Sequence, residues 1–310
     1  MFEVFIDGKE GTTGLRIYER LDADPEIVLL TPSDNDRKDP AIRAAMIAAS
    51  DITFLCLPDE AARQSVALAP PDARIIDTST AHRTDPGWTY GFPELSPTFR
   101  EGIANSRRVC VPGCHAAGFN ALVYPLIETG LLGRDSMLSC FSQTGYSGGG
   151  KAMIAEYTDP SRSDEYSSPR HYATAQTHKH LPEMTAVAGL TSPPVFVPAV
   201  SDFYSGIVVT VPLHAGQLAK RATARDIAEL YAEVYGDNGL MRPLPYTGDN
   251  IIVAANSLSG RDVMEISAQG SDDRICLTAR FDNLGKGAAG AAIQCMNLML
   301  GRDEFSRLEL

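Results

Sequence analysis

A glycine-rich turn near the start of the chain constrains the fold more than any other sequence feature. Residues 2–7 alternate as a strand does, and three glycines follow at a G-x-x-G-x-x-G spacing before an apolar helical pattern over residues 15–21. This spacing is a variant of the dinucleotide fingerprint, in which backbone amides approach a pyrophosphate at a helix N-terminus. The predicted cofactor contacts of the turn are Gly8, Gly11, Thr12, Thr13 and Gly14.

Strands and helices continue to alternate over the first hundred residues. Further strands are expected at 27–30, 51–57, 74–77 and 108–111, and helices at 40–49 and from residue 58 onwards. This alternation predicts an α/β fold with a Rossmann-type, doubly wound parallel sheet. Residues 84–105 are rich in proline, glycine and aromatic residues, so we expect an irregular loop there.

The pattern changes in the second half of the chain. An α+β domain with a mainly antiparallel sheet is expected, because its strands follow one another without intervening helices. The expected strands are 137–146, 195–200, 206–213, 251–255, 263–268 and 274–281, and the main helices of this half are 222–235 and 287–300.

Length and charge limit the classes of function. A chain of 310 residues with 44% hydrophobic content can bury the cores of two domains. The net charge of -12 argues against nucleic acid or an anionic membrane as the main partner. Six scattered cysteines, without a basic leader or a membrane-length apolar run, predict reduced thiols in a cytoplasmic protein.

The segment after the second expected strand bears on the choice of cofactor. An NAD enzyme usually places an acidic residue there, whereas Ser33 and Arg37 are suited to hold the 2′-phosphate of NADP. We therefore favour NADP, although Asp34 in the same segment keeps NAD open as the alternative.

A polar cluster follows the expected strand at 74–77. It spans residues 78–83 and includes Ser79 and Arg83. Doubly wound sheets bind ligands at the carboxyl ends of their strands, so the cluster is a candidate ligand site. An ordinary polar turn is the alternative.

Cys114 is the candidate nucleophile. An apolar strand stops at Pro112 and Gly113, the thiol follows at once, and small residues lead into the apolar pattern of residues 121–132. This places Cys114 at the opening turn of a helix, where backbone N–H groups and the helix dipole lower the pKa of a thiol. A buried inert thiol is the alternative, and we adopt that interpretation for Cys110. No second Cys/His pair has zinc-ligand spacing, so no metal site is expected.

Two stretches of the second half carry further chemistry. Residues 145–151 form a glycine-rich segment that ends in Lys151 and suits a phosphate or carboxylate, unless it is only a flexible loop. His178 and His180 lie on one side of what we expect to be an extended segment, with Glu183 nearby. A single histidine is more often structural, but this spacing suits a general acid/base that its neighbours orient.

Jointly, these motifs resemble the N-acetyl-gamma-glutamyl-phosphate reductase family in its shorter form, and the similarity spans nearly the whole chain. The motifs are the glycine turn, Pro112-Gly113-Cys114, the Ser-Gly-Gly-Gly-Lys loop, His178-x-His180-x-Pro182-Glu183 and Asn283-Leu284-x-Lys286-Gly287-Ala288-Ala289-Gly290. Each motif alone also fits the wider semialdehyde-dehydrogenase group. His115 departs from the longer form of the family, which usually has an aromatic residue after the cysteine.

The resemblance implies an oxidoreductase of arginine biosynthesis. It would use NADPH to reduce N-acetyl-L-glutamyl 5-phosphate to N-acetyl-L-glutamate 5-semialdehyde, with a thioester on Cys114 and release of phosphate. His180 would be the acid/base. Substrate contacts would come from His178, Ser147, Lys151 and Arg83, and further cofactor contacts from Ser33, Arg37, Ser79, Asn283 and Lys286.

The resemblance also implies an organisation for the chain. We expect a dinucleotide-binding domain at 1–114, a catalytic and oligomerisation domain at 115–284, and a C-terminal helix at 285–310 that returns to the nucleotide domain. The protein would be a homo-oligomer, either a dimer or a tetramer.

Two alternative functions stay open. One is another acyl-phosphate reductase, such as aspartate-semialdehyde dehydrogenase or an aminoadipyl-phosphate reductase. The other is a non-catalytic dinucleotide-binding sensor whose Cys114 responds to oxidation. A sensor has no use for the histidine pair or the glycine-rich anion site, which disfavours it.

Overall fold

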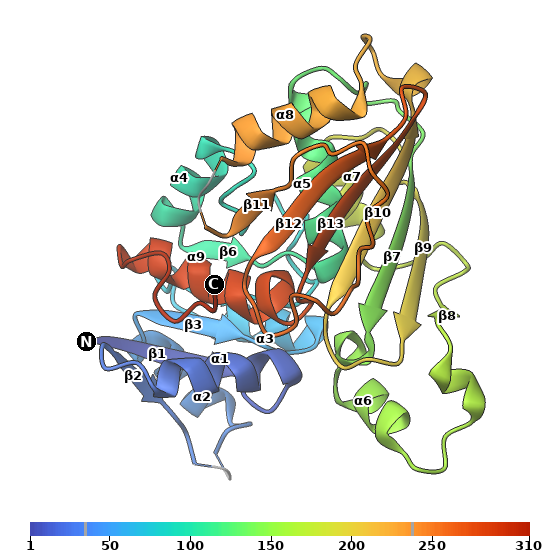
Figure 1. The fold of residues 1–310 in the computed structure, drawn as a ribbon. Coiled ribbons are helices and arrows are strands. Elements are labelled where there is room, and N and C mark those ends of the chain that lie inside the picture. Colours follow the sequence, from blue (N-terminus) through green and yellow to red (C-terminus); the bar gives the residue numbers. More distant parts are fainter. Residues whose placement is uncertain (34–35, 237–238) are drawn as a thin grey trace. The chain divides into compact units, whose positions relative to one another are not determined.

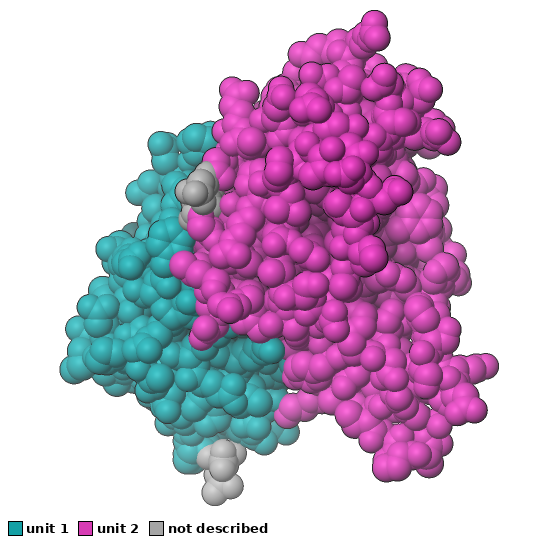
Figure 2. All heavy atoms as spheres, viewed as in Figure 1, with its two compact units in different colours: residues 1–93, 97–112, 288–308 teal, residues 94–96, 113–287, 309–310 magenta. Residues whose placement is uncertain are grey.

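The computed structural model describes residues 1–33, 36–236 and 239–310 (Figure 1). The chain divides into two compact units, which Figure 2 shows in different colours. Unit 1 comprises Met1–Pro93, Pro97–Pro112 and Ala288–Leu308, and unit 2 comprises Glu94–Ser96, Gly113–Gly287 and Glu309–Leu310.

Unit 1 is built on a six-stranded sheet in which every neighbouring pair of strands is parallel. The strands are β1 (Phe2–Asp7), β2 (Ile27–Leu30), β3 (Ile52–Leu55), β4 (Ile75–Asp77), β5 (Thr89–Tyr90) and β6 (Arg108–Cys110). Their order is β2-β1-β3-β4-β6-β5, so the winding direction reverses between β1 and β3. The helices are α1 (Thr12–Asp22), α2 (Pro40–Ala49), α3 (Asp59–Leu68), α4 (Pro97–Asn105) and α9 (Gly290–Leu300). The predicted doubly wound parallel sheet is confirmed.

Both faces of this sheet are covered, because successive side chains of a strand point to opposite faces. Val4 and Ile6 of β1 pack in one apolar cluster with residues of α1 and α9. Phe5 belongs to a second cluster, which includes Ile47 of α2 and Ala62 of α3. The strands therefore carry near-continuous apolar runs, as strands of parallel sheets do.

Unit 2 contains a mixed seven-stranded sheet of order β11-β12-β13-β10-β7-β9-β8 (Figure 1). Its strands are β7 (Ser139–Gly145), β8 (Arg170–His171), β9 (Val195–Ser201), β10 (Ile207–His214), β11 (Met241–Pro243), β12 (Met264–Gly270) and β13 (Arg274–Phe281). Only the β7–β9 and β11–β12 ladders are parallel, so the sheet is mainly antiparallel, as predicted.

The helices of unit 2 correct one detail of the sequence prediction. They are α5 (Cys114–Glu128), α6 (Gly150–Thr158), α7 (Leu181–Ala188) and α8 (Ala224–Tyr235), with short 3₁₀ helices at Tyr146–Gly149, Asp164–Ser167 and Ala215–Gln217. A short π-helix at Gly285–Ala289 spans the point where the chain passes from unit 2 to unit 1. We expected no helix between the strands, but α6 and α7 lie between β7 and β9. A parallel pair such as β7–β9 needs a long crossover connection, which this segment supplies.

Two further expectations are wrong. Residues 251–255 form no strand, and Ile251, Ile252 and Val253 instead line a hollow together with side chains of β12 and β13. Residues 84–105 are less irregular than expected, since they contain β5 and α4.

Within the described ranges, no helix is both long and apolar enough to span a membrane.

Helix α5 is buried on nearly all sides and forms the centre of unit 2. Pro125 lies inside it and has no N–H to donate to the carbonyl of Ala121. The Tyr235 hydroxyl of α8 donates to that carbonyl at 2.6 Å instead, and the Tyr231 hydroxyl donates to the carbonyl of Leu122 at 2.7 Å. Burial raises the pKa of both tyrosines well above the usual value, so both remain donors.

Candidate active site

Cys114 is the first residue of α5, where the sequence places it. The helix has no side-chain cap at Gly113 and no acidic residue of its own in its first turn. The turn before the thiol is fixed by buried Glu183 of α7, whose Oε1 accepts the N–H of Gly113 at 2.8 Å. Gly287 approaches so closely that a Cβ there would lie 3.0 Å from the Cβ of Cys114. The half-buried thiol is thus held at a helix N-terminus, an environment that favours a thiolate.

Three imidazoles gather in unit 2 beside this turn. The ring of His115 lies 5.5 Å from the rings of both His178 and His180, and those two rings are 4.7 Å apart. His115 and His180 are buried, whereas His178 is half-buried. The two paired histidines do not lie on an extended segment, because His180 caps α7 with a helical backbone and its N–H donates to Nδ1 of His178 at 3.1 Å.

His115 connects two hydroxyl groups. Its Nδ1 is 2.7 Å from Ser142 Oγ, and its Nε2 is 2.8 Å from the Tyr172 hydroxyl. Burial, together with the charges of His178 and Lys179, lowers the pKa of His115 to about 3. The ring is therefore neutral near pH 7 and carries one proton, so it donates only one of these hydrogen bonds and accepts the other.

Tyr172 interacts electrostatically with the candidate nucleophile. Burial and the charge of the Cys114 thiolate raise the pKa of the Tyr172 hydroxyl, which therefore keeps its proton. The sequence analysis missed Tyr172 and Ser142, because both reach His115 from distant segments. The one local signal was His115 itself, directly after the cysteine on the same helix.

The glycine turn of unit 1 follows β1 at the point where the sheet reverses its winding direction. Gly8 has a φ of +92°, and a Cβ there would collide with the carbonyl oxygen of Cys56 just after β3. A Cβ on Gly14 would lie 2.6 Å from the carbonyl oxygen of Gly8. Both positions require glycine for the turn to pack against the neighbouring strand.

The N-terminus of α1 fits the pyrophosphate of a dinucleotide. This helix has no side-chain cap at Gly11 and no acidic residue in its first turn. Thr12 Oγ1 is buried and has no hydrogen-bond partner in the part of the chain that the structure describes. A phosphate oxygen would satisfy this hydroxyl together with the N–H groups of the first turn, which include those of Thr13 and Gly14.

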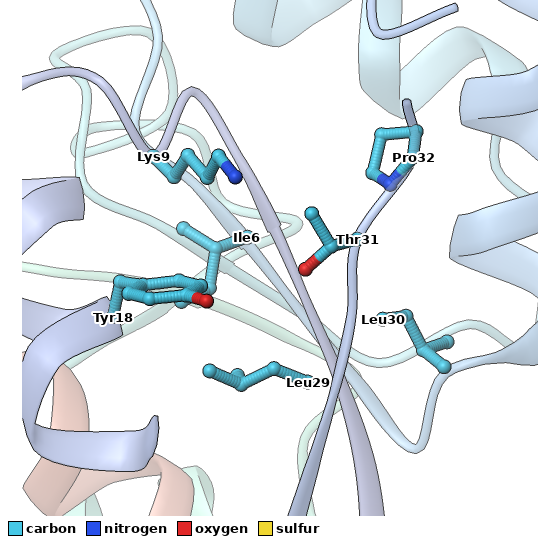
Figure 3. A pocket seen from close by; sticks show the side chains of 7 residues that line it. All are labelled: Ile6, Lys9, Tyr18, Leu29, Leu30, Thr31 and Pro32. Carbon is cyan, nitrogen blue, oxygen red and sulfur yellow. The ribbon is translucent and has the colours of Figure 1, made fainter. Parts of the chain in front are cut away.

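A hollow lies beside this turn, at the carboxyl ends of β1 and β2 (Figure 3). Its lining residues are Ile6, Lys9, Tyr18, Leu29, Leu30, Thr31 and Pro32. The Lys9 ammonium lies 5.3 Å from the centre of the Tyr18 ring. The lining thus combines apolar surface with one cation, a combination that suits an adenosine with an anionic substituent.

The predicted cofactor-selecting residues lie in the segment after Pro32. The Ser33 hydroxyl donates to Asp36 at 2.7 Å, and exposed Arg37 forms an ion pair with Glu10 of the glycine turn at 3.5 Å. Asp34, the alternative NAD ligand, lies outside the described residues. The structure therefore connects Arg37 to the glycine turn, and the role of Arg37 in selecting the cofactor stays a prediction.

Comparison with known proteins assigns the chain to a family. Residues 3–103 match the model of the semialdehyde dehydrogenase NAD binding domain, and residues 114–283 match that of the semialdehyde dehydrogenase dimerisation domain. The N-acetyl-gamma-glutamyl-phosphate reductase of Burkholderia lata is 41% identical over 98% of each chain, and reductase 2 of Nostoc sp. is 39% identical over 97% of this chain and 98% of its own. The chain belongs to the N-acetyl-gamma-glutamyl-phosphate reductase family.

Solved structures support the fold of this family member. Aspartate semialdehyde dehydrogenase II of Vibrio cholerae, complexed with ASA, matches with a TM-score of 0.71 and 16% identity over 97% of this chain and 98% of its own. A probable aspartate-semialdehyde dehydrogenase of Pseudomonas aeruginosa matches with a TM-score of 0.69 and 16% identity over 96% of this chain and 98% of its own. At this identity the likeness concerns the fold alone.

Two predicted ligand residues of this reductase-family chain make contacts within unit 1. Ser79 is buried, and its hydroxyl donates to Asp77 at 2.8 Å. The Arg83 guanidinium donates to the carbonyls of Val111 at 2.9 Å and Thr78 at 3.0 Å. These contacts fix the polar cluster after β4, and the ligand roles of Ser79 and Arg83 stay predictions.

The remaining predicted residues lie in unit 2. Asn283 accepts the N–H of Gly206 at 2.7 Å and donates to buried Ser147 Oγ at 3.1 Å. Lys286 and Glu94 form a buried ion pair of 2.7 Å, and Lys151 is exposed in the first turn of α6. Asn283 and Ser147 are thus in direct contact, and the ligand roles of all four residues stay predictions.

The low pKa of His115 predicts a loss of stability in acid. Its folded pKa of about 3 lies below the ordinary value of 6.5, so between these values the unfolded chain binds a proton that the folded protein does not. The free energy of unfolding should therefore fall as pH decreases through this window, by up to about 1.4 kcal/mol per pH unit from this group. Denaturant unfolding of wild type and His115→Gln between about pH 7 and pH 4 measures the contribution. The variant should show the shallower dependence, and equal slopes would contradict the assignment.

Proposed function

We propose that the protein reduces N-acetyl-L-glutamyl 5-phosphate to N-acetyl-L-glutamate 5-semialdehyde with NADPH and releases phosphate, a reaction of arginine biosynthesis. The observation that carries the proposal is Cys114 at the uncapped N-terminus of α5, in a unit where three imidazoles gather beside it. The reductase names of relatives that are about 40% identical over nearly their full lengths support the substrate.

The thiolate of Cys114 begins the reaction. Its sulfur attacks the acyl carbon, the bond between that carbon and the bridging oxygen of the phosphate breaks, and phosphate leaves with the bonding electrons. Negative charge develops on the acyl oxygen during this step, and N–H groups of the first turn of α5 can stabilise it. The product of this half-reaction is a thioester on Cys114.

Unit 1 would bind NADPH through the glycine turn, Thr12 and the hollow lined by Lys9 and Tyr18. The bound cofactor supplies the hydride that reduces the thioester carbonyl. Collapse of the resulting hemithioacetal then releases the aldehyde and restores the thiolate of Cys114.

His180 is the acid/base in this scheme. It removes the proton of the thiol, gives this proton to the oxygen when hydride adds to the thioester, and takes it back as the hemithioacetal collapses to the aldehyde and the thiolate. His115 is a poor candidate for this role, because both ring nitrogens are engaged and its pKa is about 3. His178, which is more exposed than His180, is assigned to the substrate.

Arg37 is expected to select NADP over NAD. A charge-assisted contact with the 2′-phosphate is worth on the order of 1.5–3 kcal/mol, so Arg37→Ala should raise the KM for NADP about tenfold or more. The KM for NAD should change little. Initial rates with both cofactors measure this, and Arg107→Ala, which removes an exposed cation just before the amino end of β6, is the control. Equal effects of Arg37→Ala on the two cofactors would contradict this role.

The sheet of unit 2 supports a homo-oligomer, which we propose to be a dimer or a tetramer. Ser142 of β7 points toward His115 of α5, so its neighbour Phe141 points to the opposite face, where it is 48% exposed. Val195 of the adjacent strand is 55% exposed, and the matching family model is described as a dimerisation domain. Light scattering on the purified protein measures the state, and a monomer would contradict the proposal. None of the six cysteines, all of which the structure describes, forms a disulfide, which fits the reducing cytoplasm.

An assay in the aldehyde-oxidising direction tests the proposed function. With NADP and phosphate, N-acetylglutamate semialdehyde should be oxidised, and omission of phosphate should stop turnover. Aspartate semialdehyde and aminoadipate semialdehyde should react much more slowly. Faster oxidation of either competitor would assign the chain to the alternative reductases, and no phosphate-dependent oxidation of any aldehyde would favour the sensor.

A further inference from the structure

The three imidazoles of unit 2 have a geometry that the reductase scheme does not use. One ring nitrogen from each of His115, His178 and His180 lies within 4.8 Å of the other two. This is the one group of three or more histidine, cysteine or acidic side chains with such spacing among the described residues. We propose that His115, His178 and His180 bind a divalent transition-metal ion of the zinc class and that the bound ion inhibits the enzyme.

The distances suit such an ion after a small closure of the site. Zinc binds imidazole nitrogen at about 2.0–2.1 Å, so tetrahedral ligands lie about 3.4 Å apart. The rings are not stacked, because their planes are inclined by 53° to 89°. Half-buried His178 lies in the turn before α7 and not within a helix or strand, so it can supply most of the movement.

The surroundings of His115 suit a metal ligand. A histidine that binds a metal usually donates its other ring N–H to an oxygen, which fixes its orientation. Ser142 Oγ, 2.7 Å from Nδ1, is placed to accept that proton, and Nε2 is then the nitrogen that faces the ion. Coordination replaces the hydrogen bond between His115 and Tyr172. At His178 it also replaces the bond from the N–H of His180, because a neutral imidazole has only one lone pair to offer.

The donor set defines the class of ion. Imidazole nitrogens suit zinc, copper, nickel and cobalt, whereas magnesium and calcium prefer oxygen ligands. Three protein ligands leave a fourth position for water or an oxyanion. The spacing of cysteines and histidines in the sequence predicts no metal site, because His115 is 63 residues from His178 in the chain.

Inhibition follows from the role of His180. A metal ion occupies the nitrogen lone pair that a general base needs, so proton transfer stops while the ion is bound. This consequence rests on the proposed function, whereas binding of the ion does not.

A metal titration tests binding without any activity measurement. The full-length chain with Cys114→Ser, which removes the thiol as a competing ligand, is stripped with a chelator and titrated with Zn²⁺ against a coloured chelator. One ion should bind per chain. His178→Gln and His115→Gln in the same background should each weaken binding at least about 100-fold, because even loss of a supporting group typically costs 10- to 100-fold. His171→Gln, an exposed histidine outside the group, is the matched control and should bind as the parent does.

Each result of the titration decides the proposal. Equal affinity in the parent and in His178→Gln would overturn it, and so would zinc binding to wild type that disappears with Cys114→Ser. Because His178 is half-buried, its variant should fold even if His115→Gln does not, and circular dichroism checks both. Co²⁺ should give the visible absorption of a four-coordinate nitrogen site in the parent and lose it in His178→Gln.

A second measurement tests the inhibition by itself. Zn²⁺ should inhibit the wild-type reductase over the concentration range in which it binds, and EDTA should restore the rate. Binding without inhibition would overturn the inhibitory role alone. If the protein showed no reductase activity, the proposed function would fail while the titration still decided the metal site.

Discussion

Replacement of Cys114 by serine is expected to lower turnover by at least about 10⁴-fold, since loss of a catalytic nucleophile typically removes most of an enzyme's rate enhancement. The serine hydroxyl stays protonated at a helix N-terminus where a thiol ionises, and it cannot form the thioester. NADPH binding should be unchanged, because the predicted cofactor contacts of the glycine turn lie in unit 1. Rates in the aldehyde-oxidising direction and a fluorescence titration with NADPH measure the two properties.

Cys110→Ser is the matched control for this experiment. Cys110 is buried at the end of β6 in unit 1, and its replacement should keep the activity. Iodoacetamide should inactivate the wild-type protein by labelling Cys114. Substantial turnover by Cys114→Ser, or inactivation through another cysteine, would show that the nucleophile lies elsewhere.

Replacement of His180 by asparagine should lower kcat by roughly 10²–10⁴-fold with a smaller change in KM, which is the usual contribution of a positioned proton-transfer group. His178→Asn should act mainly on KM. The pH profile gives a second readout, because loss of the base removes the acidic limb that its titration produces. His171→Asn, on the exposed strand β8, is the control and should retain the wild-type rate.

The converse results are also informative. A large loss of kcat in His178→Asn with weakened binding in His180→Asn would exchange the two roles. If neither variant changed kcat tenfold, the pair would be structural, and thiol activation would come from the N-terminus of α5 alone.

Local patterns were sufficient to predict the parallel sheet and the position of Cys114. The glycine turn, the apolar strands and the Pro-Gly-Cys turn each specify their backbone through neighbouring residues, so they could be recognised one at a time. Residues 251–255 show where this fails. Their apolar character resembles a strand, but apolar residues can also pack against the side chains of a sheet, and Ile251, Ile252 and Val253 line a hollow with residues of β12 and β13.

The imidazole cluster could not be predicted, because it depends on contacts between distant segments. His115 belongs to α5, Ser142 to β7, and Tyr172 to the segment that follows β8. Sequence spacing indicated a pair of histidines and gave no sign of the third. Buried partners were equally hidden, as Lys286 shows: the family resemblance implied a cofactor contact, and the structure pairs it with Glu94.

The covalent step is the central claim, and a phosphate-free reaction tests it most directly. The protein is mixed with N-acetylglutamate semialdehyde and NADP in the absence of phosphate, and NADPH and protein mass are followed together. We predict a burst of one NADPH per chain, an N-acetylglutamyl group on the peptide that contains Cys114, and turnover that resumes when phosphate is added. Sustained turnover without phosphate, or an acyl group on any other residue, would contradict the account.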